Sequence, residues 1–477
     1  MKTDTIAAIA TALSDAGIGV IRISGENAIE VGNSVFCSGN GKKILDQVES
    51  HTLHYGFIVS DTLEQNENWK QHIIDEVMIS VMKAPRSYTR EDTVEISCHG
   101  GLIVMQKIFD AVLQNGARLA EPGEFTKRAF LNGRIDLSKA EAVMDVISSQ
   151  NDYAYEAAIR QLGGNLSEKI RELRESVLYE IAFIESALDD PEHISLEGYP
   201  DRLSEKIDQL CKSTGKLIDS AENGRLIKGG IATVIVGKPN AGKSSLLNLI
   251  LGEERAIVTD IAGTTRDVLQ ESIRLHGIGL NIIDTAGIRD TQDVVEKIGV
   301  EKAKQYAKDA DLIIYVVDAS VELDDSDREI ISLLGEKNTI ILLNKSDLDT
   351  KVTEETISQL IAEVLKENRT EQIKMIRTST KENVGIEELE NVIKEMFFQG
   401  AFEENNEIVI TNMRHKEALQ DAYNSFQLVQ KSIADGMPED FYSIDLMNAY
   451  SSLGKIIGEE VEDDLVEEIF SKFCMGK

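Results

Sequence analysis

The chain has 477 residues, with 83 Asp and Glu against 50 Lys and Arg, so its formal net charge is -33. A surface this acidic repels polyanions, and a nucleic acid would need a local basic patch or a partner that supplies one. No run of about 18 apolar residues is present, which argues against a membrane-spanning helix. The first residues lack the basic start of a secretion signal, and the four cysteines include no CxxC pair. We therefore expect a cytoplasmic protein with no zinc site and no disulfide framework.

Residues 1–120 mix short apolar runs with turns. Apolar stretches predict strands at 17–24, 51–59, 75–82 and 93–98. Residues 101–117 have helical spacing and predict a helix that ends near Gly116. We expect residues 1–120 to form a small α+β domain.

Two helical zones flank the middle of the chain. Residues 121–228 and 400–477 carry apolar residues three or four positions apart, as amphipathic helices do. The simplest explanation is one helical domain that is interrupted by an inserted domain at 229–399, since insertion is tolerated where a domain's ends lie close together. Two separate helical domains remain the alternative.

The inserted segment alternates strand and helix patterns. Apolar strands that each run into a turn are predicted at 231–237, 279–287, 311–320, 339–347 and 373–380. Residues 269–275 and 279–284 flank His276 and Gly277 and are predicted to form a hairpin. This pattern indicates a mostly parallel sheet with an antiparallel edge.

A P-loop follows the first of these strands. Residues 237–244 read GKPNAGKS and precede a predicted helix, which is the context that this motif requires. Its glycines allow backbone N–H groups to face phosphates. We expect Lys243 to reach the β and γ phosphates and the Ser244 hydroxyl to bind Mg²⁺.

Three further motifs complete a guanine-nucleotide site. Asp284 to Gly287 follow a strand, where the aspartate can hold the metal through water. Asn344 to Asp347 close another strand, and the Asp347 carboxylate can accept two hydrogen bonds from guanine but none from adenine. Residues 379–381 read Ser-Thr-Lys, where GTPases carry a Ser-Ala-Lys base clamp.

The residues that we assign to GTP binding are Asn240, Ala241, Gly242, Lys243, Ser244, Ser245, Thr259, Asp260, Ile261, Ala262, Gly263, Thr264, Thr265, Asp284, Thr285, Ala286, Gly287, Asn344, Lys345 and Asp347. The expected fold is therefore multidomain, α/β and α, with a helical domain interrupted by a Ras-like P-loop G domain.

The switch segments differ from those of Ras. Either Thr264 or Thr265, with Thr265 preferred, is expected to complete the Mg²⁺ shell in the triphosphate state. Ile288 stands where Ras-type enzymes use a glutamine to position water, so another polar group must act or hydrolysis is slow. The sequence identifies no arginine finger, and the roles of Arg266 and Arg289 stay open.

Taken together, these motifs and their flanking segments resemble the MnmE/TrmE family of tRNA-modification GTPases, over essentially the whole length of the chain. Near its start the chain reads TALSDAG where the family often has a turn rich in Pro, Gly and Arg. The residues that carry the resemblance are 19–25, 86–101, 121–143, 237–248, 259–267, 284–290 and the terminal Cys474 to Lys477, which read CMGK.

The resemblance implies an activity and its partners. It implies a homodimer that hydrolyses GTP and works with an FAD-dependent MnmG/GidA-type partner, together as a heterotetramer. The implied reaction adds an aminomethyl or carboxymethylaminomethyl group to C5 of the wobble uridine of certain tRNAs. The one-carbon unit would come from 5,10-methylene- or 5-formyl-tetrahydrofolate.

The resemblance also implies site residues. Arg22, Glu95, Arg134 and Lys477 would contact the folate, so residues 1–120 would be a folate-binding-like domain that also dimerises. Cys474 would be a catalytic thiol or, alternatively, a helix-end cysteine without chemistry.

Potassium is expected to replace an arginine finger. The Asn240 side chain and oxygens of Thr259, Ile261 and Thr264 can offer ligands to a hard cation, and in the family this segment forms a potassium-binding loop. Glu296 matches the family's acid after the DxxG turn and would orient the attacking water. The runner-up function is a switch GTPase of ribosome assembly, although the sequence contains no RRM or KH signature.

Overall fold

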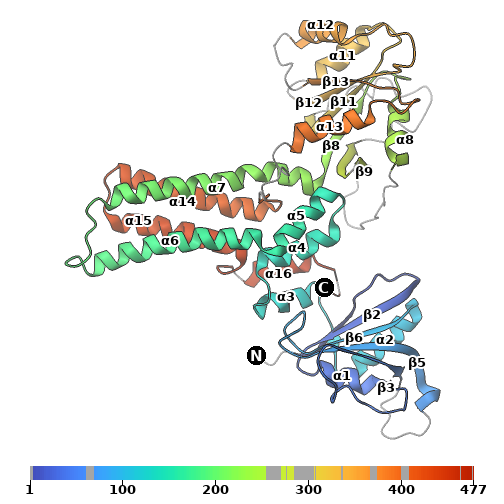
Figure 1. The fold of residues 1–477 in the computed structure, drawn as a ribbon, viewed down its shortest axis with the longest axis vertical. Helices are drawn as coiled ribbons and strands as arrows, with labels where there is room; N and C mark the ends of the chain where they lie inside the picture. Colours follow the sequence, from blue (N-terminus) through green and yellow to red (C-terminus); the bar gives the residue numbers. More distant parts are fainter. Residues whose placement is uncertain are drawn as a thin grey trace. The chain divides into compact units, whose positions relative to one another are not determined.

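The computed structural model describes residues 4–60, 69–253, 270–275, 277–283, 306, 308–334, 337–365, 373–398, 408–461, 463–474 and 476. Their contacts divide them into two compact units, whose elements are labelled in Figure 1. One unit lies within residues 1–144, 161–176 and 450–477, and the other within 145–160 and 177–449. The domain boundaries expected at 120, 228 and 399 stay predictions. Among the described helices, none is long and apolar enough to cross a membrane.

A seven-stranded sheet forms the core of the first unit. Its spatial order is β3-β4-β5-β6-β2-β1-β7. The strands are β1 (Ile6–Ile9), β2 (Ala16–Ser24), β3 (Phe36–Ser38), β4 (Thr52–Val59), β5 (Ile73–Met82), β6 (Thr93–Gly100) and β7 (Arg118–Leu119). The short helix η1 (Trp69–His72) precedes β5. Helices α1 (Ala28–Val35) and α2 (Leu102–Gln114) bury Val31 and Ile108 against inward-facing strand residues such as Ile79 and Ile96.

The four strands and the helix predicted before residue 117 are confirmed by β2, β4, β5, β6 and α2. The sequence patterns did not predict β1, α1, β3 or β7. Strand β1 is only four residues long, and it pairs with β2 and β7, which lie on either side of it. Its apolar run is too short to show a period, so only the pairing identifies it as a strand.

The end of the chain returns to the first unit. Helices α3 (Glu124–Leu131), α4 (Leu137–Ser148) and α16 (Asp463–Ser471) bury a small apolar cluster that contains Leu137, Phe470 and Phe473. Gly123 precedes α3 with a φ of 69°, and a Cβ there would lie 2.6 Å from the Phe470 carbonyl oxygen. The Gly123 N–H also donates to the Cys474 carbonyl at 3.3 Å. Glycine is therefore required where the terminal segment meets α3.

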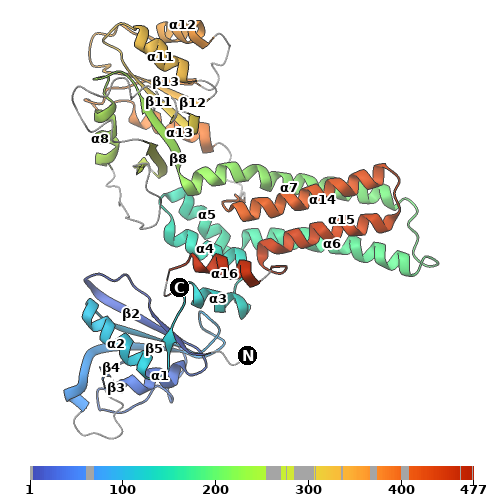
Figure 2. The ribbon, with the colours of Figure 1, turned by 180° about the vertical axis from the view of Figure 1, so that it is seen from behind.

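Long helices run side by side in the second unit (Figures 1 and 2). Helices α7 (Tyr199–Gly229) and α14 (Met413–Ala434) lie wholly in this unit, whereas α5 (Asp152–Gly163), α6 (Asn165–Asp189) and α15 (Glu439–Ile457) lie in it only in part. Leu210 and Leu217 of α7 are buried, as their spacing predicted. The Ile410 N–H donates to the Ser220 hydroxyl at 3.1 Å, which joins the start of the second helical zone to the first.

A six-stranded sheet carries the P-loop, with the order β13-β12-β11-β8-β10-β9. Its strands are β8 (Ile231–Val236), β9 (Gln270–Leu275), β10 (Ile278–Ile283), β11 (Leu312–Asp318), β12 (Asn338–Asn344) and β13 (Ile373–Arg377). All neighbouring pairs are parallel except the β9–β10 edge. The predicted strands, the hairpin and the antiparallel edge are confirmed.

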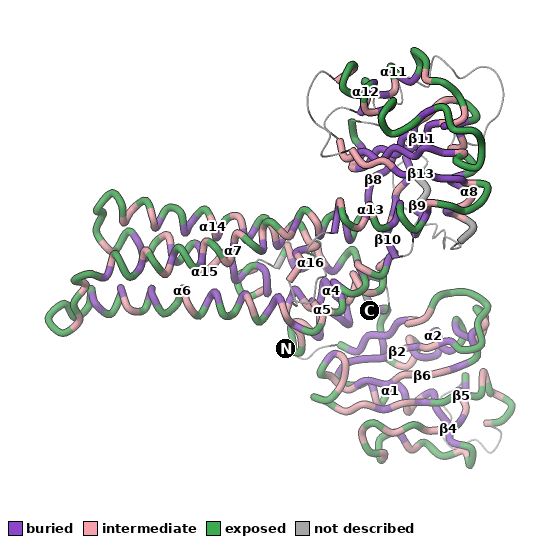
Figure 3. The backbone as a smooth tube through the Cα atoms, turned by 45° about the horizontal axis from the view of Figure 1, so that its top comes forward, coloured by how far each residue is buried: buried purple, intermediate pink, exposed green. Residues whose placement is uncertain are grey.

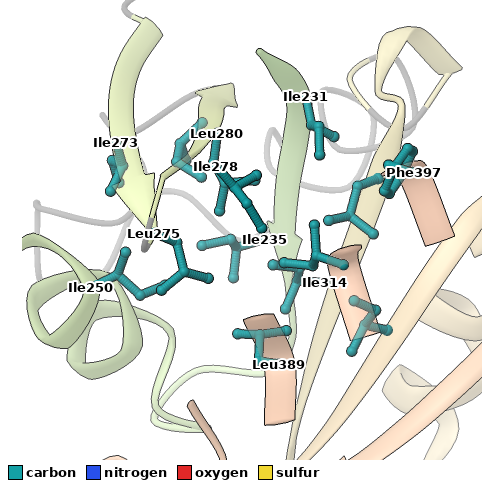
Figure 4. Close-up of a cluster of buried hydrophobic side chains, with 14 of the residues drawn as sticks. Ile231, Ile235, Ile250, Ile273, Leu275, Ile278, Leu280, Ile314, Leu389 and Phe397 are labelled. Carbon is teal, nitrogen blue, oxygen red and sulfur yellow. The ribbon is translucent and has the colours of Figure 1, made fainter. Parts of the chain in front are cut away.

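Helices cover both faces of this sheet. They are α8 (Lys243–Glu253), α11 (Asp325–Leu334), α12 (Glu354–Leu365) and α13 (Ile386–Phe398). Leu389 of α13 and Ile250 of α8 pack against Ile235 and Ile314 on one face (Figure 4). Helices α11 and α12 cover the other face, and the central strand β11 is buried along most of its length (Figure 3). In such sheets ligands bind outside the carboxyl ends of the strands, where the predicted motifs lie.

Candidate nucleotide and folate sites

The P-loop turns between β8 and α8 on two glycines that admit no side chain. Gly237 has a φ of 152°, and a Cβ on it would lie 2.3 Å from the Val316 carbonyl oxygen. Gly242 has a φ of 111°, and its Cβ would lie 2.1 Å from the Asn344 side-chain nitrogen. Both positions combine a left-handed conformation with a close approach, which only glycine accepts. Asn240, between them, has a φ of 61°, a region that asparagine tolerates better than most residues.

Lys243 lies at the start of α8, and its ammonium group turns back over the loop. It donates to the carbonyl oxygens of Gly237 and Lys238, both at 2.7 Å. Burial lowers the pKa of Lys243. Ser244 and Ser245 follow on the first turn of the helix and are exposed. A lysine and a helix N-terminus at one loop make a place where an anion is stabilised.

Asn344 connects the P-loop to the turn after β13. Its side-chain nitrogen donates to the Ala241 carbonyl at 2.8 Å, and its side-chain oxygen accepts from the Thr380 N–H at 3.1 Å. Thr378 donates to the same oxygen at 3.4 Å. Asn344 is fully buried at the end of β12, so these bonds fix two loops that are far apart in sequence.

Asp347 lies on the exposed side of the same loop. The Ser379 hydroxyl donates to its carboxylate at 2.7 Å, and this bond lowers the pKa of Asp347. Lys345 has a φ of 63°, and its ammonium group pairs with Asp318 at the end of β11. The arrangement presents an ionised carboxylate that can accept hydrogen bonds from a ligand.

The structure thus brings together the P-loop residues with Asn344, Lys345 and Asp347. No group of three His, Cys, Asp or Glu within the described ranges is arranged to hold a metal ion. The remaining predicted nucleotide, metal and catalytic residues lie outside the described residues: Thr259, Asp260, Ile261, Ala262, Gly263, Thr264, Thr265, Asp284, Thr285, Ala286, Gly287 and Glu296.

A second cluster, in the first unit, contains three of the four predicted folate residues. Arg22 of β2 and Glu95 of β6 are cross-strand partners, and the Arg22 Nε donates to Glu95 at 2.7 Å. The Arg22 Nη1 donates to the Gly476 carbonyl at 2.9 Å. The guanidinium carbon of Arg22 lies 5.5 Å from the centre of the Tyr88 ring. A strand pair and the end of the chain therefore meet at one arginine.

Arg134 reaches the same tyrosine. Its guanidinium carbon lies 4.7 Å from the Tyr88 ring centre, and its Nη1 donates to the Tyr88 carbonyl at 3.0 Å. The Tyr88 hydroxyl forms a hydrogen bond with Thr126 at 2.9 Å. Tyr88 was missed as a site residue, although it lies in the 86–101 segment that carries the family resemblance. Cys474 is exposed, and Lys477 lies outside the described residues.

Most of the chain matches two known protein families. Residues 5–134 match the family described as the N-terminus of the GTP-binding protein TrmE. Residues 137–474 match the family described as the MnmE helical domain.

Individual relatives match over the full length. The chain is 55% identical over 477 residues to the tRNA modification GTPase MnmE of Lachnoclostridium phytofermentans, with 100% of both chains covered. It is 51% identical over 478 residues to the tRNA modification GTPase MnmE of Clostridioides difficile, with 99% of each covered. The G domain of the T. maritima FeoB iron transporter is 25% identical and covers 35% of this chain and 98% of its own. Its TM-score of 0.25 is too low to establish a shared fold.

Proposed function

Because the chain belongs to the MnmE family of tRNA modification GTPases, we propose that it hydrolyses GTP at the P-loop and couples this reaction to tRNA modification in the cytoplasm. The observation that carries the proposal is the pair of contacts made by Asn344. It binds the Ala241 carbonyl on the phosphate side and the Thr380 N–H on the base side. One buried side chain thereby sets the spacing between the two ends of a bound nucleotide.

Guanine recognition is assigned to Asp347, whose ionised carboxylate matches two donors of the base. Asp347→Asn should weaken GTP binding and improve binding of xanthosine triphosphate, because the exchanged donor pattern matches xanthine. Asp349→Asn is the matched control, since Asp349 is exposed two residues further along the same loop. The assignment fails if the Asp347 variant prefers GTP as strongly as the parent.

Magnesium is assigned to the Ser244 hydroxyl and, in the triphosphate state, to Thr265. Ser244 fits this role because it is exposed at the first turn of α8, directly after Lys243. The ion would polarise phosphate oxygens and neutralise their charge. Ser244→Ala should therefore reduce Mg²⁺-dependent hydrolysis far more than Ser245→Ala does. Equal losses would remove the assignment.

Potassium stimulation is assigned to the Asn240 side chain with oxygens of Thr259, Ile261 and Thr264, while Glu296 orients water. The φ of 61° at Asn240 decides which variants test this. Asn240→Gly removes the oxygen without backbone strain, and Asn240→Asp keeps an oxygen. The first should abolish the difference between rates in K⁺ and in Na⁺ at equal ionic strength, and the second should retain it. Equal parental rates in both salts would exclude a potassium role, and an unimpaired Glu296→Ala would exclude the water-positioning role.

Folate binding is assigned to Arg22, Glu95, Arg134 and Lys477. This assignment is supported by the guanidinium groups of Arg22 and Arg134, which both lie over the Tyr88 ring. Two neighbouring arginines suit a carboxylate ligand such as the glutamate tail of a folate. We expect calorimetry of the full chain with 5-formyl-tetrahydrofolate to give saturable heat without GTP. Arg134→Gln should weaken that binding, whereas Arg86→Gln, an exposed change in the same unit, should not. No saturation at millimolar ligand would count against the site.

Homodimerisation is assigned to the first unit. Alternation along β4 and β5 places Val77 and Ile79 toward α1 and α2, so Leu53, Tyr55 and Met78 lie on the opposite face, where they are exposed. An apolar sheet face of this kind is a common dimer contact. Tyr55→Lys should dissociate the dimer in analytical ultracentrifugation. Leu428→Lys, an equally exposed apolar position on α14, should leave it intact.

The tRNA and the FAD-dependent MnmG/GidA-type partner complete the proposal. The net charge of -33 predicts weak, salt-sensitive binding of free tRNA and tight binding by the heterotetramer. Analysis of wobble uridines in tRNA from cells that lack the gene tests the modification itself. These uridines are expected to lack the aminomethyl or carboxymethylaminomethyl group at C5. Nanomolar tRNA affinity of this chain alone at physiological salt would contradict the division of labour.

A further inference from the structure

Lys238 is a P-loop lysine whose side chain faces away from the loop. Its ammonium group lies 2.7 Å from an Asp327 carboxylate oxygen and 3.0 Å from an Asp324 carboxylate oxygen. Only 17% of its side chain is exposed. Burial alone would lower the pKa of Lys238, but the hydrogen bonds to Asp327 and Asp324 outweigh burial and raise it. Two carboxylates compensate this one cation, so it has no free charge to offer a phosphate.

Asp327 is the centre of this contact. Its carboxylate accepts from the Tyr315 hydroxyl at 2.7 Å and from the Asp324 N–H at 2.9 Å, in addition to Lys238. The side chain is 1% exposed, so its position is determined by three donors in a buried environment. Asp324 in turn accepts from the Ser326 N–H at 2.9 Å, so both aspartates accept backbone N–H groups at the start of α11. Strand β11 and helix α11 thus present one rigid acceptor to the P-loop.

The consequence for the nucleotide site follows from the backbone of Lys238. Its carbonyl oxygen and that of Gly237 receive the Lys243 ammonium group. The end of β11 also contacts the opposite side of the site, because Asp318, the last residue of this strand, pairs with Lys345. The segment 318–327 therefore contacts both loops between which a nucleotide would bind.

We propose that Lys238 is a positioning residue, which fixes the first turn of the P-loop against Asp327 and so sets the place of Lys243. The inference rests on the proposed function, since it concerns the same nucleotide site. It assigns to Lys238 a role in nucleotide affinity and none in contact with the reacting phosphate.

The test compares variants in the full-length protein by fluorescent GDP binding and steady-state GTP hydrolysis. Lys238→Met should raise the Kd for GDP and the KM for GTP by about tenfold or more, the factor that one charge-assisted hydrogen bond is worth. The kcat should stay within about threefold, because a shifted Lys243 would lose binding to the ground state and to the transition state alike. Lys238→Arg, which keeps donors for both carboxylates, should restore KM. Asp327→Asn should raise KM as well, and it should add little to Lys238→Met in the double variant.

Arg328→Met is the matched control. Arg328 is also on α11, but it pairs with Glu363 at 2.8 Å and not with the P-loop. It should leave KM unchanged, which separates a general loss of helix stability from lost positioning. If Lys238→Met does not fold, Lys238→Gln carries the same comparison.

Two results would overturn the inference. One is a Lys238→Met enzyme with parental Kd and KM. The other is a loss of kcat at unchanged KM, which would mean that Lys238 acts on the reacting phosphate. A parent that binds no guanine nucleotide would instead overturn the proposed function, and the positioning role with it.

Discussion

Arg128 is the residue of the first unit whose loss we expect to be most damaging to stability. Its guanidinium group is 8% exposed and binds Glu91 at 3.1 Å, Glu124 at 2.8 Å and Asp4 at 2.8 Å. Arg128→Met keeps the apolar stem of the side chain and removes the charge. The carboxylates of α3, of the start of the chain and of the turn after β5 would then face one another without it.

The magnitude follows from which carboxylate is left alone. Removing one partner of a buried ion pair typically costs about 3 to 5 kcal/mol. Glu124 keeps Arg118 at 2.6 Å, and Glu91 keeps the Ser24 hydroxyl at 2.9 Å. Because both retain a donor, we expect the lower end, about 3 kcal/mol of unfolding free energy. At a slope near 2 kcal/mol per molar urea, the midpoint should fall by about 1.5 M.

Trp69 makes this measurable in one part of the chain. It is the single tryptophan of the protein, and its ring packs 5.5 Å from that of Phe57 in the sheet of the first unit. Urea titration followed by its fluorescence therefore reports that unit. Lys127→Met is the control, since Lys127 pairs with Glu467 at 3.4 Å at an exposed site, where such pairs are worth about 0 to 1 kcal/mol. Equal midpoint shifts for the two variants would refute the reasoning.

Three other outcomes are expected. Burial would raise the pKa of Glu124, but the hydrogen bonds that its carboxylate accepts outweigh burial and lower this pKa below 4.5. The contribution of Glu124 to stability is therefore present above pH 4.5 and is lost as the pH falls through the folded-state pKa. Glu124→Gln should flatten the acid limb of a plot of urea midpoint against pH. At pH 8 Ellman's reagent should label the exposed Cys474 first. Burial raises the pKa of Cys98 to about 11 and should protect this thiol until the protein unfolds. Equal labelling rates for the two cysteines would contradict this. Gly242→Ala should lower GDP affinity at least about tenfold, because the new Cβ would lie 2.1 Å from the Asn344 side-chain nitrogen and break its buried hydrogen bond to the Ala241 carbonyl. Fluorescent GDP titration measures this affinity, and an unchanged value would contradict the prediction.

The nucleotide-binding sheet could be predicted from sequence because its signals are local. Strands β8, β11 and β12 are nearly continuous apolar runs that each end in a motif or a turn, and Gly277 marks the β9–β10 hairpin with a φ of 87°. Motif residues such as Lys243 and Asp347 have a fixed spacing from those strands. Their position at one edge of the sheet then follows from parallel connection alone.

The partners inside the sites could not be predicted in the same way. Asp327 looks like an ordinary residue of a helix N-terminus, and only the tertiary fold places it beside Lys238. Tyr88 lies in a turn without periodicity, and its contact with Arg134 spans 46 positions of sequence. Side-chain pairs of this kind depend on register and packing, which no local pattern encodes.

The terminal segment shows how structural and proposed chemical roles meet in the same residues. Gly476 has a φ of 95°, and a Cβ there would lie 2.7 Å from the Ile9 carbonyl oxygen, so β1 accepts only glycine at this point. Its carbonyl takes the Nη1 donor of Arg22, and Glu95 takes the Nε donor. Among the contacts of the described residues, the Nη2 side of Arg22 is the part of this group left to receive a carboxylate. The guanidinium groups of Arg22 and Arg134 both lie over the Tyr88 ring, so a carboxylate that bound beside this ring would be near two cations. The Gly476 carbonyl thus occupies one of the donors that Arg22 could offer to a ligand. Removing Gly476 should therefore alter ligand binding, even though glycine has no side chain that could contact the ligand.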